Sequence, residues 1–532
     1  MGTYLNPDND EFIMALNSKL YVDKSLLIST VNECVRTLQR YMCISRPRRF
    51  GKSTALNMLS AYYSRGEDTA AFFSRLQIAR DASFTTHLNK YNVLRINVQD
   101  FLSFSTSITE MLNTISKYII SDLLDEYPDI RYKDTANLVQ VMKDIYAQKP
   151  IPFIILIDEW DCLFREYQGD EQGQRQYLDF LRTWLKDKSY VGLVYMTGIL
   201  PIKKYGTHSA LNMFTEYSMT EPRELAEYFG FTENEVRALC QHRNQSYEEV
   251  KAWYDGYELL IPHNTHNDTD WKSYSLYNPK SVIEAMLSGH CGPYWNKTET
   301  YEALKIYIQM NYDGLKDAIV TMMAGSSVQI DTSTFNNDMT TFHSKNDVLT
   351  LLVHLGYLSY NAKTKTVAIP NREIYKEYAN AVSLMNWPEV TKSIQSSQQL
   401  LQHLIAGDAE AVAQGLDTAH AEISILKYND ENSLSCAINL AFYFAREYYT
   451  IIRELPSGKG FADITLLPRP KYAEKPAIII ELKWDKSAAG AIRQIKERNY
   501  TGVLQNYTGN ILLAGITYDK HSKKHQCIIE KI

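Results

Sequence analysis

The chain has 532 residues, of which 45% are hydrophobic and 22% are charged. These values are typical of globular proteins, and they exclude intrinsic disorder, collagen-like and coiled-coil architectures for most of the chain. At about 100–200 residues per domain, the length predicts about three domains. The formal net charge of -6 argues against a protein coated in nucleic acid, but it leaves room for a local basic groove.

The cysteines and the apolar runs indicate the cellular compartment of the protein. The seven cysteines are scattered and include no C-x-x-C pair, which is typical of reduced thiols in a cytosolic protein. The longest apolar runs, such as 153–157 and 477–480, are far shorter than the roughly 18 residues that a membrane helix requires. The first residues, MGTYLNPDNDEF, are acidic where a secretory signal would be basic. We therefore expect a cytoplasmic protein with no membrane partner.

In the first 215 residues, short apolar runs alternate with amphipathic stretches. The pattern predicts strands over 41–45, 92–98, 153–157 and 191–197, and helices over 53–63, 108–124 and 174–186. The run 153–157 is apolar throughout, as expected of a central strand buried on both faces. The alternation predicts a parallel sheet with right-handed crossovers, flanked by helices, and hence an α/β domain over 1–215.

The middle of the chain, 216–400, has a different pattern. It predicts helices over 223–229 and 233–242, followed by a stretch most of which lacks strands of any length. Near 347–371, a helix followed by two short strands is typical of a winged-helix or small α+β element. Such an element either binds DNA or packs between domains. For the middle of the chain, the pattern therefore predicts a mainly helical region with a winged-helix-like part.

A second α/β domain is expected over 401–532. Its pattern predicts strands over 449–454, 461–467 and 477–482, with a helix over about 488–500 behind them.

The segment Ser45–Ser53, SRPRRFGKS, lies between a predicted strand and a predicted helix. A phosphate-binding loop needs this context, because backbone N–H groups and the helix N-terminus attract phosphate while Lys52 reaches it. Ser53 would ligate Mg²⁺ through its hydroxyl, although Ser45 stands where the usual motif begins with glycine. The alternative is that Ser53 only caps the helix. Arg46, together with Arg48 and Arg49, either touches phosphate or a neighbouring subunit, or holds the loop by salt bridges.

A carboxylate pair follows the apolar run 153–157, at the carboxyl end of that strand, where ligands bind in open α/β sheets. Asp158 would hold Mg²⁺, and Glu159 would polarise the water that attacks the γ-phosphate. The alternative is a solvated acidic turn. Thr197, at the end of the next strand, is either a sensor of the γ-phosphate or a structural threonine. The predicted nucleotide-binding residues are Arg48, Arg49, Phe50, Gly51, Lys52, Ser53, Thr54, Asp158 and Thr197, with ATP and Mg²⁺ as cofactors.

The C-terminal domain carries a second candidate centre. Glu481 and Lys483 project to the same side of a predicted strand, and Asp463 lies on a neighbouring strand. Two carboxylates and an ammonium can bind Mg²⁺, generate a hydroxide near a phosphodiester and stabilise the developing charge. The alternative for Glu481 and Lys483 is a solvated ion pair at a strand end.

Three further residues complete this prediction. Glu431, on a preceding helix, would add a carboxylate. Gln494 and Tyr500, on the helix behind the strands, would position the lysine or touch a phosphate.

Several motifs together resemble the bacterial AAA-ATPase-like family, many members of which carry a C-terminal nuclease-like domain. The motifs are YVDKS (21–25), SRPRRFGKS (45–53), the strand-DEWD run (153–161), TGILPIKKY (197–205), YFGFTENEV (228–236) and WYDGY (253–257). The C-terminal region resembles the PD-(D/E)xK nuclease superfamily, where Asp463, Glu481 and Lys483 match the motif position by position. Gln494 and Tyr500 resemble its trailing helix element, and Glu431 is a weaker match. The resemblance implies ATP binding and a restriction-endonuclease-like fold.

These observations predict an ATPase in which nucleotide binding or turnover gates a Mg²⁺-dependent nuclease acting on DNA. The first alternative is a nucleotide-dependent switch whose C-terminal domain recognises nucleic acid or a partner without cutting it. The second is a structural ATPase that assembles into a homo-oligomer, with the nuclease-like fold as an interaction module.

Overall fold

The computed structural model describes most of the chain in two compact units. The described residues are 2–202, 211–262, 271–295, 301–310, 312–337, 339–385, 387–422, 431–457, 460–484, 487–497 and 509–532. The first unit comprises Met1–Arg243, Gly256–Leu287 and Ile330–Val367. The second unit comprises Asn244–Asp255, Ser288–Gln329 and Ala368–Ile532.

The first unit is built around a five-stranded sheet. Its strands are β1 (Tyr41–Ser45), β2 (Asn92–Asn97), β3 (Phe153–Asp158), β4 (Val191–Gly198) and β5 (Thr215–Tyr217). The order is β2-β3-β4-β1-β5, and every pair is parallel, which confirms the predicted parallel sheet. Every residue of β3 and β4 is buried, as their continuous apolar runs predict. The short strand β5 was not predicted.

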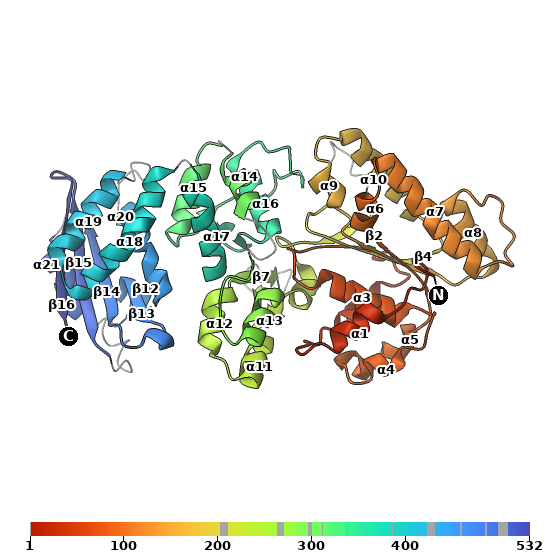
Figure 1. Ribbon diagram of the computed structural model, residues 1–532, viewed down its shortest axis with the longest axis horizontal. Helices are drawn as coiled ribbons and strands as arrows, with labels where there is room; N and C mark the ends of the chain where they lie inside the picture. The colour runs from red at the N-terminus through yellow and green to blue at the C-terminus, as the bar shows by residue number, and fades with distance from the viewer. Residues whose placement is uncertain are drawn as a thin grey trace. The chain divides into compact units, whose positions relative to one another are not determined.

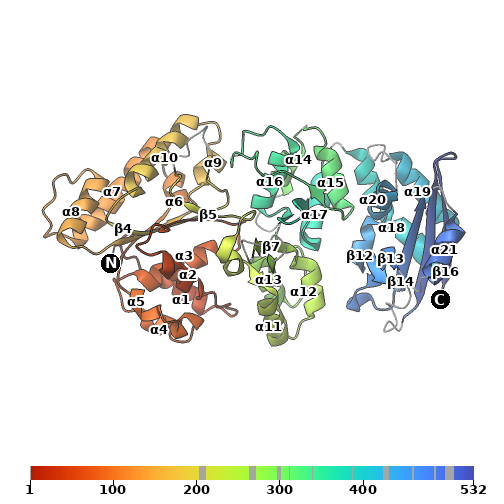
Figure 2. The same ribbon diagram turned by 180° about the vertical axis from the view of Figure 1, so that it is seen from behind.

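Helices cover both faces of this sheet (Figures 1 and 2). The helices α7 (Ile108–Glu126), α8 (Leu138–Gln148) and α10 (Glu171–Leu185) lie on one face, and α1 (Asp10–Leu16) and α3 (Lys52–Tyr63) lie on the other. The predicted helices thus form within a few residues of their expected bounds. The remaining short helices of this part are α2 (Leu27–Cys34), α4 (Ala70–Phe73), η1 (Gln77–Arg80), α5 (Phe84–His87), α6 (Val98–Ser103) and α9 (Cys162–Glu166).

The stretch after 242 contains strands, although most of it is expected to lack them. The strands β6 (Phe231–Thr232), β7 (Tyr257–Pro262) and β8 (Trp271–Tyr277) form an antiparallel sheet in the order β6-β8-β7. The strand β8 carries Lys272, Ser273 and Ser275 among its aromatic residues, and its buried positions are confined to its end. This composition hides the period-two pattern that identifies a half-buried strand.

Other predictions for the middle of the chain are confirmed. Both expected helices form, as η2 (Arg223–Tyr228) and α11 (Glu233–Arg243). A helix and two adjacent short strands follow as predicted, as α16 (Lys345–Leu355), β10 (Ser359–Asn361) and β11 (Thr366–Ala368). A capping box between Ser344 and Asp347 begins α16, and Gly356, with φ 86°, ends it. The other elements are α12 (Tyr247–Tyr254), α13 (Pro279–Ser288), α14 (Tyr301–Ile308), α15 (Leu315–Met323), β9 (Val328–Gln329) and α17 (Arg372–Ser383).

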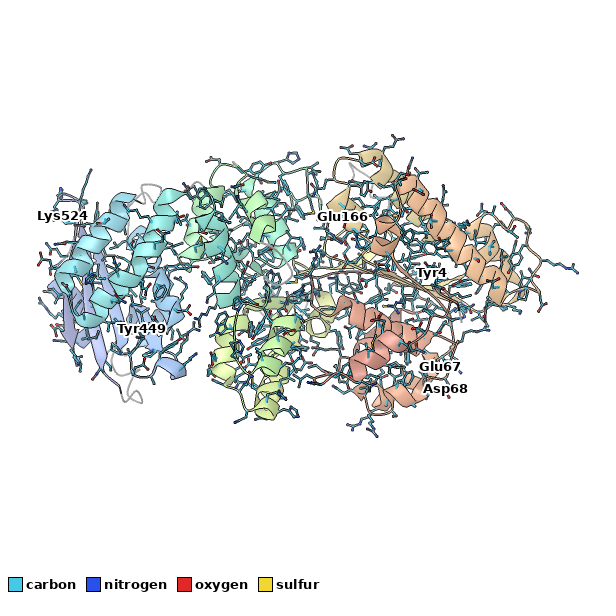
Figure 3. The ribbon with its side chains drawn as sticks, in the orientation of Figure 1. Tyr4, Glu67, Asp68, Glu166, Tyr449 and Lys524 are labelled. Carbon is cyan, nitrogen blue, oxygen red and sulfur yellow. The ribbon has the colours of Figure 1, made fainter. Side chains whose placement is uncertain are left out.

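The second unit contains a mixed sheet. Its strands, in spatial order, are β12 (Tyr449–Ser457), β13 (Gly460–Pro468), β14 (Ala477–Trp484), β15 (Ile511–Asp519) and β16 (Lys524–Lys531). Only the pair β14 and β15 is parallel. Tyr449 and Lys524, labelled in Figure 3, mark the first residues of β12 and β16. The first three strands confirm the prediction, whereas β15 and β16 were not predicted.

Two apolar clusters hold this sheet between helices. One cluster joins the sheet to α18 (Pro388–Ala406), α19 (Ala409–Glu422) and α20 (Glu431–Ala441), and the other joins it to α21 (Ala488–Glu497). Two 3₁₀ helices, η4 (Tyr443–Glu447) and η5 (Pro470–Tyr472), flank the first two strands.

Within the described ranges, no helix has the length and apolar character to cross a membrane.

The glycine at position 515 lets α21 pack directly on β15. A Cβ at Gly515 would lie 2.6 Å from the backbone oxygen of Ala488 and 3.1 Å from the Cβ of Ala491. We expect Gly515→Ala to lower the free energy of unfolding by about 1–3 kcal/mol, because the helix backbone must move to make room. Urea unfolding of the full chain measures this change.

Gly292→Ala, in the same unit, is the control, because the atoms nearest to its Cβ would be ring atoms of Tyr294 at 3.9 Å. An equal loss of stability in both variants would contradict the packing argument.

Candidate nucleotide site and nuclease-like centre

The loop between β1 and α3 has the backbone shape of a phosphate cradle. Arg49 (φ 67°) and Gly51 (φ 89°) both adopt left-handed conformations on either side of Phe50. Such alternation turns successive backbone N–H groups toward one side, and the N-terminus of the twelve-residue helix α3 adds positive potential. A Cβ at Gly51 would meet no atom within 4 Å, so the positive φ, not crowding, is what favours glycine there.

Lys52 is buried in this loop. Its Nζ donates to the backbone oxygens of Arg46 and Pro47, each at 3.0 Å. Burial lowers the pKa of the Lys52 ammonium, and the nearby carboxylates, led by Glu159 and then Asp158, oppose that shift. The lysine is therefore a desolvated cation that faces two acidic side chains and retains one N–H donor for a phosphate group.

The first residues of the loop are anchored to the sheet. The Ser45 hydroxyl donates to the backbone oxygen of Leu200 at 2.9 Å, so the serine at the usual glycine position has a structural partner. Arg46 is fully buried and donates to the backbone oxygens of Ser45 and Tyr217 at 3.0 and 2.7 Å. Burial lowers its pKa to about 9. Arg46 thus holds the loop against β5, which favours the structural alternative for this arginine.

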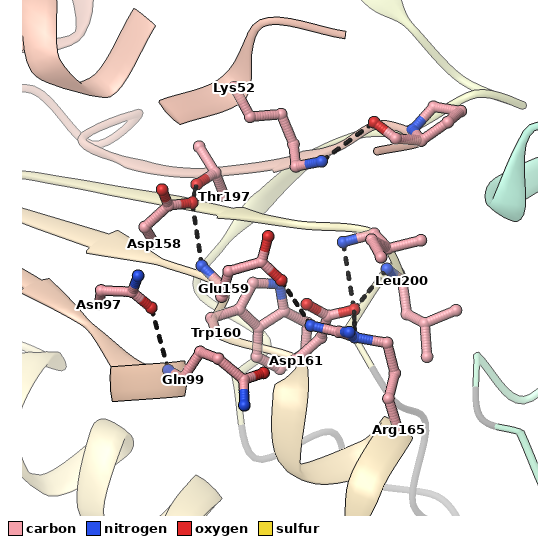
Figure 4. Close-up of polar contacts among 12 residues, drawn as sticks. Lys52, Asn97, Gln99, Asp158, Glu159, Trp160, Asp161, Arg165, Thr197 and Leu200 are labelled. Atoms are coloured by element: carbon pink, nitrogen blue, oxygen red, sulfur yellow. Dashed lines mark hydrogen bonds and ion pairs between the residues drawn. The ribbon is translucent and has the colours of Figure 1, made fainter. Parts of the chain in front are cut away.

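Asp158 and Thr197 meet at the carboxyl ends of β3 and β4. The Thr197 hydroxyl donates to Asp158 Oδ1, which also accepts from the backbone N–H of Glu159 at 3.0 Å (Figure 4). Thr197 is fully buried, so its hydroxyl orients the aspartate in this structure. This contact favours the alternative that Thr197 is a structural residue.

Glu159 follows in a left-handed conformation, with φ 51°. Its carboxylate forms an ion pair with the Arg165 guanidinium (Figure 4). Burial raises the pKa of Glu159, and the charges of Lys52 and Arg165 oppose that shift. Both cations therefore favour the ionised form, which a base or a water-orienting group requires.

Two buried residues of this network, Asp161 and Arg165, were not predicted. Asp161 is fully buried; its Oδ2 accepts from the backbone N–H groups of Ile199 and Leu200 at 3.1 and 2.9 Å and lies 3.4 Å from Arg165 Nε. The carboxylate of Asp161 thus ties the turn after β3 to the turn after β4. Its presence in the DEWD run was the available signal. For Arg165, the i,i+4 spacing from Asp161 was the available signal.

Gly198 makes room for this arrangement. A Cβ at Gly198 would lie 2.6 Å from Asp161 Oδ1 and 2.7 Å from the Trp160 ring.

A cavity of about 530 Å³ lies over the loop. Among the predicted residues, Arg48, Arg49, Gly51, Lys52, Ser53, Thr54 and Glu159 line it. Asp158 and Thr197 are buried and do not line it. Ser53 and Thr54 are exposed residues, so nothing in the described part of the chain covers the Ser53 hydroxyl.

The same cavity includes Pro279, Lys280 and Ile283 of α13, which were not predicted. A second, mainly apolar cavity of about 310 Å³ shares Gly51, Thr54, Pro279 and Ile283 with the first, and its wall includes Tyr21, Tyr228, Phe50 and Phe231. The two cavities together suit a nucleotide: the flat face of its base fits the apolar cavity, and its anionic phosphates fit the cavity with the basic side chains. Tyr21 and Tyr228 belong to motifs noted in the sequence, but α13 gave no such signal.

Phe50 connects three of those motifs. Its ring packs edge-on against Tyr257 of the WYDGY motif, with ring centroids 5.2 Å apart. Its backbone oxygen accepts from the N–H of Gly230, in the YFGFTENEV motif, at 3.1 Å. Gly230 has φ 94°, and a Cβ there would lie 3.3 Å from the Phe50 ring. Phe50 therefore fixes the loop while its ring forms part of the apolar cavity wall.

In the second unit, the predicted nuclease-like residues lie together at the β13–β14 pair. Ile464 stands opposite Ile480, so Asp463 and Glu481 are the next residues along the two strands. Asp463 Oδ2 accepts from the backbone N–H of Leu482 at 2.7 Å.

Glu481 is held from two sides. Its Oε1 accepts from Lys483 Nζ at 2.9 Å and from the Gln494 side chain on α21. The structure thus brings Asp463, Glu481, Lys483 and Gln494 together as predicted. Tyr500 lies outside the described residues, as does the side chain of Glu431, although the backbone of Glu431 begins α20.

Two carboxylates fit a magnesium ion at this centre. Mg²⁺ is commonly held by one or two carboxylates while its other ligands are water and substrate phosphate. In the part of the chain that the structure describes, no group of three or more His, Cys, Asp or Glu side chains is placed to hold a metal. Asp463 and Glu481 are the two carboxylates of this centre that could ligate the ion.

The fold and these two sites define a P-loop nucleotide-binding domain joined to a nuclease-like domain. Comparison with family models makes this specific: residues 11–207 match the family of predicted AAA-ATPases, and residues 430–527 match the PD-(D/E)XK nuclease superfamily. The chain thus carries an AAA-ATPase-like domain and a C-terminal PD-(D/E)XK nuclease superfamily domain, which confirms the resemblance seen in its motifs.

A relative from Azotobacter chroococcum mcd 1, described as an uncharacterized protein in the vnfD 5' region, is 22% identical over 507 residues, which is 90% of each chain. Two solved Aeropyrum pernix structures are also similar. ORC2, in its ADPNP-ADP complexes, has a TM-score of 0.29 and 9% identity, over 69% of this chain and 97% of that one. ORC1, in complex with DNA, has a TM-score of 0.24 and 12% identity, over 72% and 97%. TM-scores of this size do not establish a shared fold.

The buried pair between Asp161 and Arg165 gives a prediction for stability. Arg165→Gln leaves Asp161, which is 0% exposed, without its cation. We expect the free energy of unfolding to fall by about 3–5 kcal/mol, as when one partner of a buried ion pair is removed. Denaturant unfolding of the full chain measures the loss.

Arg175→Gln is the matched control, because Arg175 forms the same i,i+4 pair with Glu171 at 65% exposure of both side chains. That variant should change stability by no more than about 1 kcal/mol. Equal effects of the two substitutions would show that burial of the pair is not what matters.

Proposed function

We propose that the protein binds and hydrolyses Mg·ATP in the first unit and that this site gates a metal-dependent nuclease centre in the second. One observation carries the ATPase part. A single cavity is lined by Lys52 and Ser53 of the loop, by Glu159, and by Lys280, which comes from a part of the chain far away in sequence. That set matches the needs of phosphoryl transfer: cations for the phosphates, a hydroxyl for the metal and a carboxylate for water.

Each residue has a role in this proposal. Lys52 and the backbone N–H groups of the loop bind the phosphates, and Ser53 with Asp158 would hold Mg²⁺, which neutralises charge on the phosphates. Glu159 orients and deprotonates the attacking water. Arg165 positions Glu159 by its ion pair, and Thr197 positions Asp158 by its hydrogen bond.

In the nuclease-like centre, Asp463 and Glu481 would hold Mg²⁺, which supplies a Lewis acid for a phosphodiester of DNA. Lys483 lies 2.9 Å from Glu481 and is placed to orient the attacking water and to stabilise charge on the phosphate. The superfamily match over 430–527 supports this assignment.

The buried state of Glu481 favours a second candidate function. Glu481 is 1% exposed, and its carboxylate is held by Lys483 and Gln494. A centre closed in this way is compatible with a nucleotide-dependent switch whose C-terminal domain recognises nucleic acid or a partner without cleavage. Absence of Mg²⁺ binding at Asp463, Glu481 and Lys483, together with no cleavage by the parent protein, would favour the switch.

The ATPase proposal predicts different effects for two variants. Lys52→Ala should weaken ATP binding by at least about tenfold, since a charge-assisted contact to phosphate is lost. Glu159→Gln should retain binding and lower the hydrolysis rate by about 10²–10⁴-fold, because general base catalysis is lost. Fluorescent-nucleotide titration and phosphate release measure the two effects.

Lys117→Ala, at an exposed position on α7, is the control and should change neither quantity. Normal hydrolysis by Glu159→Gln would exclude the proposed role of Glu159.

The nuclease proposal predicts that Asp463→Asn abolishes cleavage. Linear and circular DNA and RNA are incubated with Mg²⁺ or Mn²⁺, and with ATP, a non-hydrolysable analogue or no nucleotide. Glu474→Gln, at an exposed position before β14, should cleave like the parent protein. If Lys52→Ala leaves cleavage and its nucleotide dependence unchanged, the two centres are not coupled.

A further inference from the structure

Four arginines line one cavity of the second unit. The cavity measures about 410 Å³, and the residues are Arg372, Arg446, Arg453 and Arg469. They come from the N-terminus of α17, from η4, from β12 and from the residue that follows β13. Among the described residues that form its wall there is no aspartate or glutamate. So many guanidinium groups around one space need an explanation, because like charges repel.

Two of the arginines are held by uncharged partners. Arg453 donates to the hydroxyls of Ser326 and Ser435, the latter at 3.0 Å. Arg446 lies over the rings of Tyr375 and Tyr443, at 4.8 and 5.0 Å from their centroids. Both groups are therefore fixed in place with their charge uncompensated by these contacts.

The other two arginines lie closer to a carboxylate. Arg372 forms an ion pair with Glu447 at 2.6 Å and lies over the Trp253 ring at 4.3 Å. Arg469 donates to the backbone oxygen of Tyr449 at 3.3 Å. Burial, followed by the charge of Arg372, lowers the pKa of Arg469 to about 10. Glu447 also lies 3.6 Å from Lys376, and Glu249 is a second carboxylate close enough to act on the charge of Arg469. The positive charges around the cavity therefore outnumber these two carboxylates.

Three of these arginines also retain a buried N–H donor. Arg372 Nε, Arg446 Nη1 and Arg469 Nη1 have no hydrogen-bond acceptor in the described part of the chain. Arg372 is only 9% exposed. These guanidinium groups therefore keep unused N–H donors close to the cavity.

We propose that this cavity binds the terminal phosphate group of a nucleotide or of a nucleic-acid strand. Guanidinium groups recognise phosphate oxygens through paired N–H donors, and several of them suit a dianion better than a carboxylate. The N-terminus of the twelve-residue helix α17 forms part of the wall through Pro370 and Asn371 and adds positive potential. A cavity of this volume is of the size that small ligands occupy.

This site is distinct from the nuclease-like centre. Arg453 stands opposite Ile464, whose side chain belongs to the apolar cluster shared with α18, α19 and α20. Glu481 is instead held by Gln494 of α21, on the other face of the sheet. The proposal therefore does not depend on ATP hydrolysis or on DNA cleavage.

The test uses the full chain carrying Lys52→Ala, in EDTA, so that neither the P-loop nor a bound metal contributes. The probes are AMP and a 3'-labelled single-stranded DNA decamer with either a 5'-phosphate or a 5'-hydroxyl. We expect binding of AMP or of the phosphorylated decamer, and at least tenfold weaker binding when Arg446→Gln and Arg469→Gln are combined. AMP binding identifies a free nucleotide as the ligand, and a preference for the 5'-phosphate without AMP binding identifies a strand end.

Lys392→Gln removes one exposed charge from α18 and is the control, which should bind like the parent. The single variant Arg469→Gln should unfold at the same temperature as its parent or higher, because it removes charge repulsion; a purely structural arginine would lower that temperature. Unchanged binding of both probes in the double variant, or no binding of either probe by the parent, would overturn the proposal.

Discussion

Parallel pairing of β4 between β1 and β3 is the constraint on which the nucleotide site depends. Parallel strands end at the same edge of a sheet, so the loop after β1 and the carboxylates after β3 are brought together by hydrogen bonds between strands far apart in sequence. Asp161 then ties the turns after β3 and β4 to each other through backbone N–H groups. Lys52, Asp158 and Glu159 owe their proximity to this arrangement, because the intervening segments return the chain to the same edge.

The acidic network after β3 and the arginine cavity differ in how their buried charges are compensated. In the first unit, Lys52 faces carboxylates, and Arg165 is paired with both Glu159 and Asp161. Burial alone would lower the pKa of Arg165, but these acids outweigh burial and raise it. Around the arginine cavity of the second unit, the partners are mainly hydroxyls, aromatic rings and backbone oxygens. Removing one partner of a compensated pair leaves a buried charge unpaired, whereas repulsion among uncompensated like charges is relieved by an anionic ligand.

In the nuclease-like centre, a pair of strands and one helix together position Glu481. The β13–β14 pair sets Asp463 beside Glu481, while Gln494 of α21 and Lys483 hold the glutamate. Gly515 allows α21 to approach the sheet closely enough for that contact. The position of the glutamate is thus fixed by backbone packing as much as by the motif itself.

The sequence by itself determined the parallel sheet of the first unit, the loop 45–53, the acidic pair Asp158–Glu159 and the set Asp463, Glu481 and Lys483, because each depends on a local pattern of a few residues. It did not reveal β7 and β8, since polar residues in β8 hide the strand period, nor β15 and β16. Only the tertiary structure decided that Arg165 pairs with Glu159, that α13 forms part of the nucleotide cavity and that four arginines share one cavity. These outcomes depend on side chains that come from distant segments or from turns, and no local period or spacing records which of them meet.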